Sequence, residues 1–222
     1  MSAATDSEQP VIGRSAQKRQ AILYAARDLF LQKGYAGASM DEVAATADVS
    51  KVTIYKHFSD KDTLFVAVVT DAIDDAKAGS QSLVDQLGTS TDIELDLRDF
   101  ARRHIALVTQ PHLIQVRRMI IAEARRFPDL ARAWHRIGPE RGHATLASQI
   151  DKLVARGQLQ VADSLLAAQL LNYLILSVPL NEAMFTGREK PYSRRYLNRY
   201  ADEAVRVFLA AYGSGRRAHR PR

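Results

Sequence analysis

Two helix-start signals lie close together near the N-terminus of this 222-residue chain. Ser39 precedes Glu42 by three positions, which is the spacing of a capping box. Ser50 can cap a second short helix in the same way. We therefore expect one short helix from Met40 to about Ala47 and a second one ending near Phe58, joined by a tight turn.

Longer helical patterns flank this pair on both sides. Apolar residues at helical spacing predict a first helix from about Ala16 to Lys33, which Gly34 stops. On the other side, Ser59 or Asp60 can cap a long fourth helix with a continuous apolar stripe. A long helix, two short ones and another long one form the outline of a three-helix DNA-binding unit, with a helix-turn-helix over residues 39–58.

The third predicted helix has one apolar side. Ile54 and Phe58 are one turn apart and should enter a small core with Val49, which leaves polar residues and Val52 on the other sides. Lysines neutralise phosphates, hydroxyls donate to phosphates or base edges, and a valine packs on a thymine methyl group. The candidate DNA-binding residues are Ser39, Ser50, Lys51, Val52, Thr53, Tyr55, Lys56, His57 and Lys61. Of these, His57 has an equally plausible alternative as a helix-end residue.

The run from Gly34 to Phe65 resembles the N-terminal domain of the TetR family of bacterial transcriptional repressors. The resemblance includes the Ser39 cap, the segment TIYKHF from Thr53 to Phe58, and a lysine that opens the fourth helix. It implies that the third helix meets DNA and that Lys61 holds a phosphate.

A second resemblance covers the C-terminal part. The segment from Arg117 to Ile150, followed by RGQL at residues 156–159, is similar to the effector domain of the AefR-like subgroup. This implies a homodimer that binds a palindromic operator on double-stranded DNA and leaves it when a small molecule enters the C-terminal domain. The ligand expected there is apolar or amphipathic, and activation in place of repression stays open.

Two C-terminal segments are candidates for the dimer interface. Residues 165–185 are apolar nearly all round, which favours a helix buried on more than one side over a membrane span, because Gln169, Asn172 and Pro179 interrupt the run. Residues 192–212 place apolar residues on one face. We expect a homodimer through helices within 165–185 and 192–212.

A ligand cavity needs apolar walls with a few polar groups. The candidate lining residues are His104, Met119, Trp134, Asn172, Tyr173 and Met184. Each of them has a simpler explanation as a core residue. The arginines at 117, 118, 125 and 126 are interpreted as a solvated face, and Gly138-Pro139 is expected to break the helix between His135 and His143.

Composition bounds the remaining choices. The 46% apolar content and the scarcity of Gly and Pro favour an all-α protein of about nine helices. The absence of cysteine removes thiol chemistry, and the N-terminus has no signal-peptide pattern, so we expect a cytoplasmic protein without a membrane segment. The net charge of +6 suits a polyanionic partner. The expected divisions are a flexible segment 1–14, a DNA-binding domain 15–61, an effector and dimerisation domain 62–212, and a basic tail 213–222.

Other function classes have less support in the sequence. A phosphate-binding glycine loop, a nucleophile elbow and a dinucleotide fingerprint are all missing, and the carboxylates have no paired spacing, so we expect neither an enzyme nor a bound cofactor. The histidines show no compact metal-binding pair, so no metal site is expected. A constitutive architectural DNA-binding protein without an effector is the remaining alternative.

Overall fold

The structure is a computed structural model that describes residues 13–84, 87–187 and 190–214. For residues 73–83 it describes the backbone only. The expected N-terminal segment and basic tail lie largely outside these ranges. Within them the chain is all-α, as predicted, with one isolated β-bridge between Leu159 and Gly213.

The described chain divides into two compact units within helix α4, after Val68. The smaller unit contains α1 (Arg14–Gly37), α2 (Met40–Thr46), α3 (Lys51–His57) and the start of α4 (Lys61–Val84). The larger unit continues with η1 (Leu87–Thr89), α5 (Ile93–Val108), α6 (Pro111–Glu123), α7 (Pro128–His135), η2 (Arg136–Glu140), α8 (Arg141–Ala155), α9 (Ser164–Phe185) and α10 (Arg194–Tyr212).

Three aromatic rings form the centre of the smaller unit. Phe65 of α4 packs edge-on against Phe30 and Tyr35 of α1, with ring centroids 5.3 Å and 5.1 Å apart. Gly34 adopts a φ of 71° inside α1, so the regular helix pauses there and a last turn places Tyr35 over this core. Because the first turns of α4 complete the core, this unit extends seven residues past the boundary expected at residue 61.

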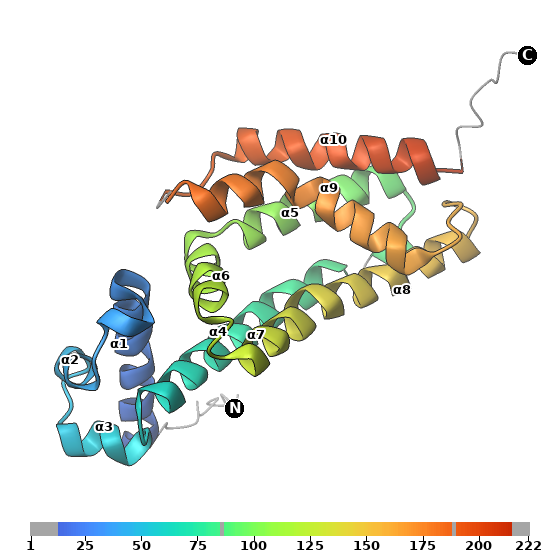
Figure 1. Cartoon of the computed structure of the whole chain (residues 1–222). Coiled ribbons are helices and arrows are strands. Elements are labelled where there is room, and N and C mark those ends of the chain that lie inside the picture. The colour runs from blue at the N-terminus through green and yellow to red at the C-terminus, as the bar shows by residue number, and fades with distance from the viewer. Residues whose placement is uncertain (1–12, 85–86, 188–189, 215–222) are drawn as a thin grey trace, which may run out of the picture. The chain divides into compact units, whose positions relative to one another are not determined.

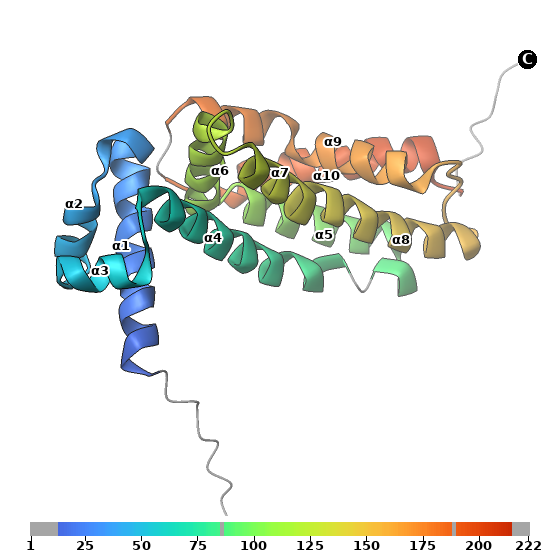
Figure 2. The ribbon, with the colours of Figure 1, turned by 60° about the horizontal axis from the view of Figure 1, so that its bottom comes forward.

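Helix α9 occupies the middle of the larger unit. It packs against both α8 and α10, and α10 also runs along α5 (Figures 1 and 2). The fully buried residues Leu97, Ile105, Leu171 and Phe208 belong to one core that these helices share.

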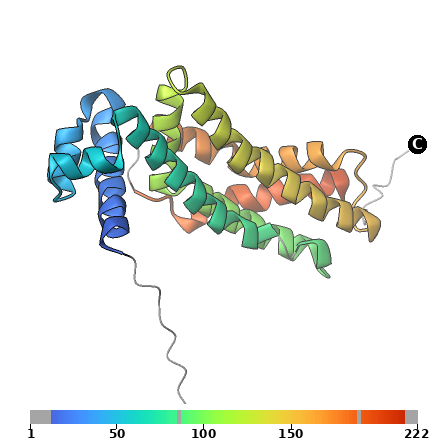
Figure 3. The same ribbon diagram turned by 90° about the horizontal axis from the view of Figure 1, so that it is seen from below.

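The predicted break at Gly138-Pro139 is wrong. Helices α7 and α8 are joined through η2, a π-helical turn, and form one continuous ribbon (Figure 3). The Arg141 N–H reaches back to the Arg136 carbonyl, five residues away, and this wider turn contains Pro139 without ending the helix. Counting this segment once gives nine helices in the described ranges, six before it and two after it.

Only one side of α9 is buried within a single chain. Leu166, Leu170, Leu174 and Val178, spaced four residues apart, are between 38% and 50% exposed. By length and composition α9 also qualifies as a membrane-spanning helix, but a core helix of a soluble protein passes the same test, and Ala168, Leu171 and Ile175 of α9 are completely buried in the core.

Candidate nucleic-acid interface

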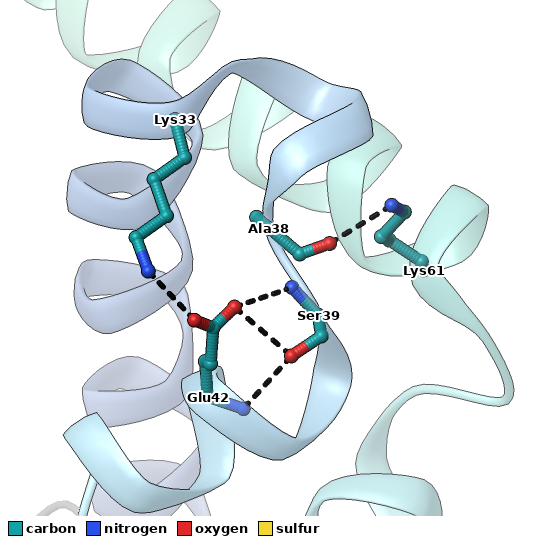
Figure 4. A network of polar contacts seen from close by, with 5 residues as sticks. All are labelled: Lys33, Ala38, Ser39, Glu42 and Lys61. Carbon is teal, nitrogen blue, oxygen red and sulfur yellow. Dashed lines mark hydrogen bonds and ion pairs between the residues drawn. The ribbon is translucent and has the colours of Figure 1, made fainter.

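Helix α2 begins at the predicted capping box. The Glu42 N–H donates to Ser39 Oγ at 3.2 Å, and the Ser39 N–H donates back to Glu42 Oε2 at 3.1 Å. The Lys33 ammonium of α1 adds a contact of 2.6 Å to Glu42 Oε1 (Figure 4). The hydrogen bonds from Lys33 and Ser39 lower the pKa of Glu42. Ser39 therefore fixes the start of α2, and its side chain is already engaged.

A turn in the left-handed region connects α2 to α3. Asp48 has a φ of 53°, and the Val49 N–H donates to the Ala44 carbonyl at 3.0 Å. Ser50 then caps α3 by accepting from the Thr53 N–H at 3.1 Å, and the two hydroxyl groups lie 2.9 Å apart. The two caps and the turn hold α3 in a defined direction against α2.

Helix α3 presents most of its surface to solvent. Ile54 is completely buried and Phe58, just past the helix, is 3% exposed, so they anchor α3 in the core as predicted. Val52 is 79% exposed and Tyr55 is 51% exposed, so two large apolar or aromatic side chains of α3 face solvent. The remaining predicted positions are exposed at Ser50, Lys51 and Lys56 and half-buried at Thr53 and His57.

The two lysines of α3 have different surroundings. Lys51 Nζ lies 2.6 Å from Asp41 Oδ2 of α2, and this hydrogen bond raises the pKa of Lys51. Both side chains are well exposed, so the pair contributes little to stability and can exchange its partner. Lys56 makes no ion pair with any residue that the structure describes. The outer face of α3 therefore offers hydroxyls, an apolar contact and positive charge, which are the groups that read and hold DNA.

The Lys61 ammonium contacts the end of α1 in this structure. It donates to the Ala38 carbonyl at 2.9 Å (Figure 4). It also donates to the Tyr35 carbonyl at 2.8 Å, with the Ala36 carbonyl at 3.4 Å, and it sits 4.5 Å from the centre of the Tyr35 ring. These carbonyls lack helical partners because α1 ends at Gly37. In this structure the ammonium therefore caps α1, and its donors point at protein carbonyls in place of a phosphate.

A cavity of about 180 Å³ lies within the larger unit. Four of the six predicted pocket residues line it: His104, Trp134, Asn172 and Tyr173. The His104 and Asn172 side chains meet at 2.8 Å between Nε2 and Oδ1, while burial lowers the pKa of His104. The arrangement provides apolar walls with a few fixed polar groups, as ligand sites require.

The other two predicted pocket residues are not among the lining residues. Met119 is 7% exposed and belongs to the buried face of α6. The Met184 carbonyl accepts from Arg118 Nε at 2.9 Å at the end of α9. Residue type was the reason for predicting both methionines as pocket residues, and each lies on a side of its helix that does not line the cavity.

Among the lining residues of the cavity that the sequence reasoning missed, two are buried or half-buried basic side chains. Arg117 and His143 both line it, although Arg117 was expected on a solvated face. Each stands on an apolar stripe: Leu113 precedes Arg117 by four positions, and His143 begins the buried series Leu146, Ala147 and Ile150 of α8. A polar residue at helical spacing from buried apolar residues is the sequence signal that could have identified both residues.

Comparisons with known proteins agree with this geometry. Residues 22–68 match the family model "Bacterial regulatory proteins, tetR family", and residues 96–214 match "AefR-like transcriptional repressor, C-terminal domain". The transcriptional activator FasR of Mycolicibacterium smegmatis is 39% identical over 82 residues, which cover 37% of this chain and 36% of FasR. The repressor TetR of Mycobacteroides abscessus is 29% identical over 184 residues, covering 80% of this chain and 92% of the relative.

Solved structures extend the similarity to nearly the whole chain. The crystal structure assigned to a TetR-family transcriptional regulator of Mesorhizobium loti is 44% identical with a TM-score of 0.82, covering 91% of this chain and all of its own. The flavonoid-responsive regulator FrrA is 26% identical with a TM-score of 0.71, covering 90% of this chain and 99% of its own. With a helix-turn-helix at one end and an AefR-like domain over more than half its length, the chain belongs to the TetR family of bacterial transcriptional regulators.

Proposed function

We propose that this regulator is a repressor that binds a palindromic operator as a homodimer and is released by a small molecule in the larger unit. The observation that carries the DNA-binding part is the outer face of α3, where Val52, Tyr55 and Lys56 are exposed on a helix fixed by caps at Ser39 and Ser50.

The roles on DNA divide by chemistry. Lys51, Val52, Thr53 and Lys56 are the candidate base readers, since they combine charge, a hydroxyl and an apolar contact on one helix. Tyr55 sets the register through phosphate contacts, and Ser39 contributes through the N-terminus of α2. We leave Lys61 out of the proposed phosphate contacts, because its ammonium donates to the carbonyls of Tyr35 and Ala38.

The dimer follows from the exposed side of α9. An apolar, periodic row on α9 consists of Leu166, Leu170, Leu174 and Val178. On α10, Val207 is a further exposed apolar residue, with an exposed fraction of 38%. An apolar row of this kind is typical of a surface that another chain covers. A second copy of the chain gives a two-fold arrangement, which matches two operator half-sites about 34 Å apart or a multiple of that spacing.

Release requires that the ligand bind one conformation of the dimer better than another. Helix α4 belongs to both units, so a change in the part of α4 that lies in the larger unit is covalently linked to the DNA-binding unit. The cavity in the larger unit is the site where we place the ligand.

Selection of bound fragments from a random-sequence duplex library tests the proposal. We expect an enriched inverted repeat at low and at moderate salt, and its loss in a Thr53→Ala/Tyr55→Ala double variant. Salt-sensitive binding without any enriched sequence would support the architectural alternative. Sedimentation of the free protein measures the dimer independently of DNA.

A further inference from the structure

Basic side chains gather in the cavity of the larger unit. Its lining includes Arg117, Arg141, His104 and His143, and none of the lining residues that the structure describes is acidic. Burial lowers the pKa of the Arg117 guanidinium, and only the Tyr173 hydroxyl acts in the opposite direction. Arg117 therefore lies half-buried without a described carboxylate to offset its charge, an arrangement that costs free energy until a counter-charge arrives.

A second polar group of the cavity lacks a partner. His143 is 6% exposed, and its Nε2 atom has no hydrogen-bond partner within the described residues. His143 and Arg117 both help to lower the pKa of His104, which places the three groups in one neighbourhood. Buried polar atoms normally find a partner, so an orphaned Nε2 beside a ligand cavity indicates a group that the ligand supplies.

The dimensions of the cavity limit the ligand. Its volume of about 180 Å³ is close to the roughly 150 Å³ of an engineered protein cavity that binds benzene. Apolar side chains supply most of the wall: Phe100, Leu107, Leu113, Leu176 and Leu180. One aromatic ring or a short branched chain fills such a space.

We propose that the effector is a small apolar carboxylate, of the size of a substituted benzoate, whose carboxylate pairs with Arg117 and accepts a hydrogen bond from His143 Nε2. This inference rests on the proposed function, because it names the ligand of the same site. The carboxylate supplies the counter-charge that Arg117 lacks, and the ring occupies the apolar part of the cavity. A neutral compound of the same shape fills the same walls but leaves the guanidinium unpaired.

The chain carries its own reporter for the test. Trp134 is its single tryptophan and lines the cavity. We would titrate the full-length protein at pH 7.5 with 4-ethylbenzoate and with 4-ethylbenzamide, following tryptophan fluorescence and confirming affinities by calorimetry. The benzoate should bind at least about 10-fold more tightly, the difference expected for one charge-assisted hydrogen bond away from bulk water.

Two arginine variants make the test specific. Arg117→Met should abolish the preference for the benzoate while leaving the benzamide affinity within about twofold, and Arg117→Lys should restore part of the preference. Arg103→Met is the matched control, because Arg103 is 51% exposed, pairs with Asp99 and does not line the cavity. Thermal unfolding checks that each variant folds.

Equal affinities of the wild type for both probes, a preference that survives in Arg117→Met, or no binding of either probe would each overturn the proposal. The selection of operator fragments is read separately. A chain that binds an inverted repeat but not the benzoate refutes the ligand class alone, whereas a chain that prefers the benzoate but selects no DNA refutes the proposed function.

Discussion

Replacing Lys61 with methionine separates a structural role from a phosphate contact. The ammonium holds the part-buried carbonyls of Tyr35 and Ala38, and methionine keeps much of the apolar stem while removing all three donors. Losing a hydrogen-bonding charge at part-buried carbonyls costs about 1–3 kcal/mol, and the contact with the Tyr35 ring adds about 0.5–1 kcal/mol. We expect a total destabilisation of about 1.5–4 kcal/mol.

The matched control is Lys56→Met on α3. Lys56 is exposed and makes no ion pair in the described part of the chain, so its loss should change stability by less than about 0.5 kcal/mol. Lys56 is proposed to contact DNA as a cation, so its loss should instead reduce the slope of log affinity against log salt concentration by about 0.9 per subunit.

Thermal unfolding and operator binding at several salt concentrations give both quantities for both variants. Lys61→Met should lower the Tm by roughly 3–16 °C, taking about 2–4 °C per kcal/mol for a chain of this size, and leave the salt slope unchanged. An unchanged Tm together with a reduced slope would refute the capping role and return Lys61 to the phosphate backbone.

Three further predictions concern the reading helix, the dimer and the cavity. Val52→Ala should relax the preference at one position of each half-site in a repeated selection, and a uniform loss on all sequences would contradict its role in base reading. Leu170→Lys should shift the protein toward monomer in sedimentation and weaken operator binding, whereas an intact dimer would exclude this face as the interface. Burial lowers the pKa values of His104 and His143 below the ordinary 6.5, so the unfolded chain binds protons at a higher pH than the folded chain does. The free energy of unfolding should therefore fall as the pH drops from 7.5 through about 6.5 toward 5. His143→Phe should make this pH dependence weaker.

Local signals predicted the smaller unit well. Ser39 and Glu42 form the capping box, Ser50 caps α3, and Asp60 caps α4 by accepting from the Thr63 N–H at 2.7 Å. Each of these contacts joins residues three positions apart, so spacing alone determines it. The Lys61 contact to Tyr35 spans 26 residues, and no local pattern contains it.

The larger unit was harder because its geometry depends on distant packing. Gly138-Pro139 has the composition of a helix break, yet the π-helical turn accommodates the proline within a continuous helix. Arg117 resembles its neighbours Arg118, Arg125 and Arg126 in sequence, and only its phase relative to Leu113 places it in the cavity wall. Residue type identified four cavity residues, while orientation on the helix decided which methionines and arginines belong there.

The shortness of α3 has a consequence for how such regulators acquire new operators. Of its seven residues, Ile54 alone is buried, and Phe58 just past its end completes the anchor, so the exposed positions of α3 carry little structural cost. An isolated helix of this length would not form, so its shape comes from the caps and core beneath it. The reading surface can therefore be rewritten residue by residue, by natural drift or by design, on a scaffold that does not change.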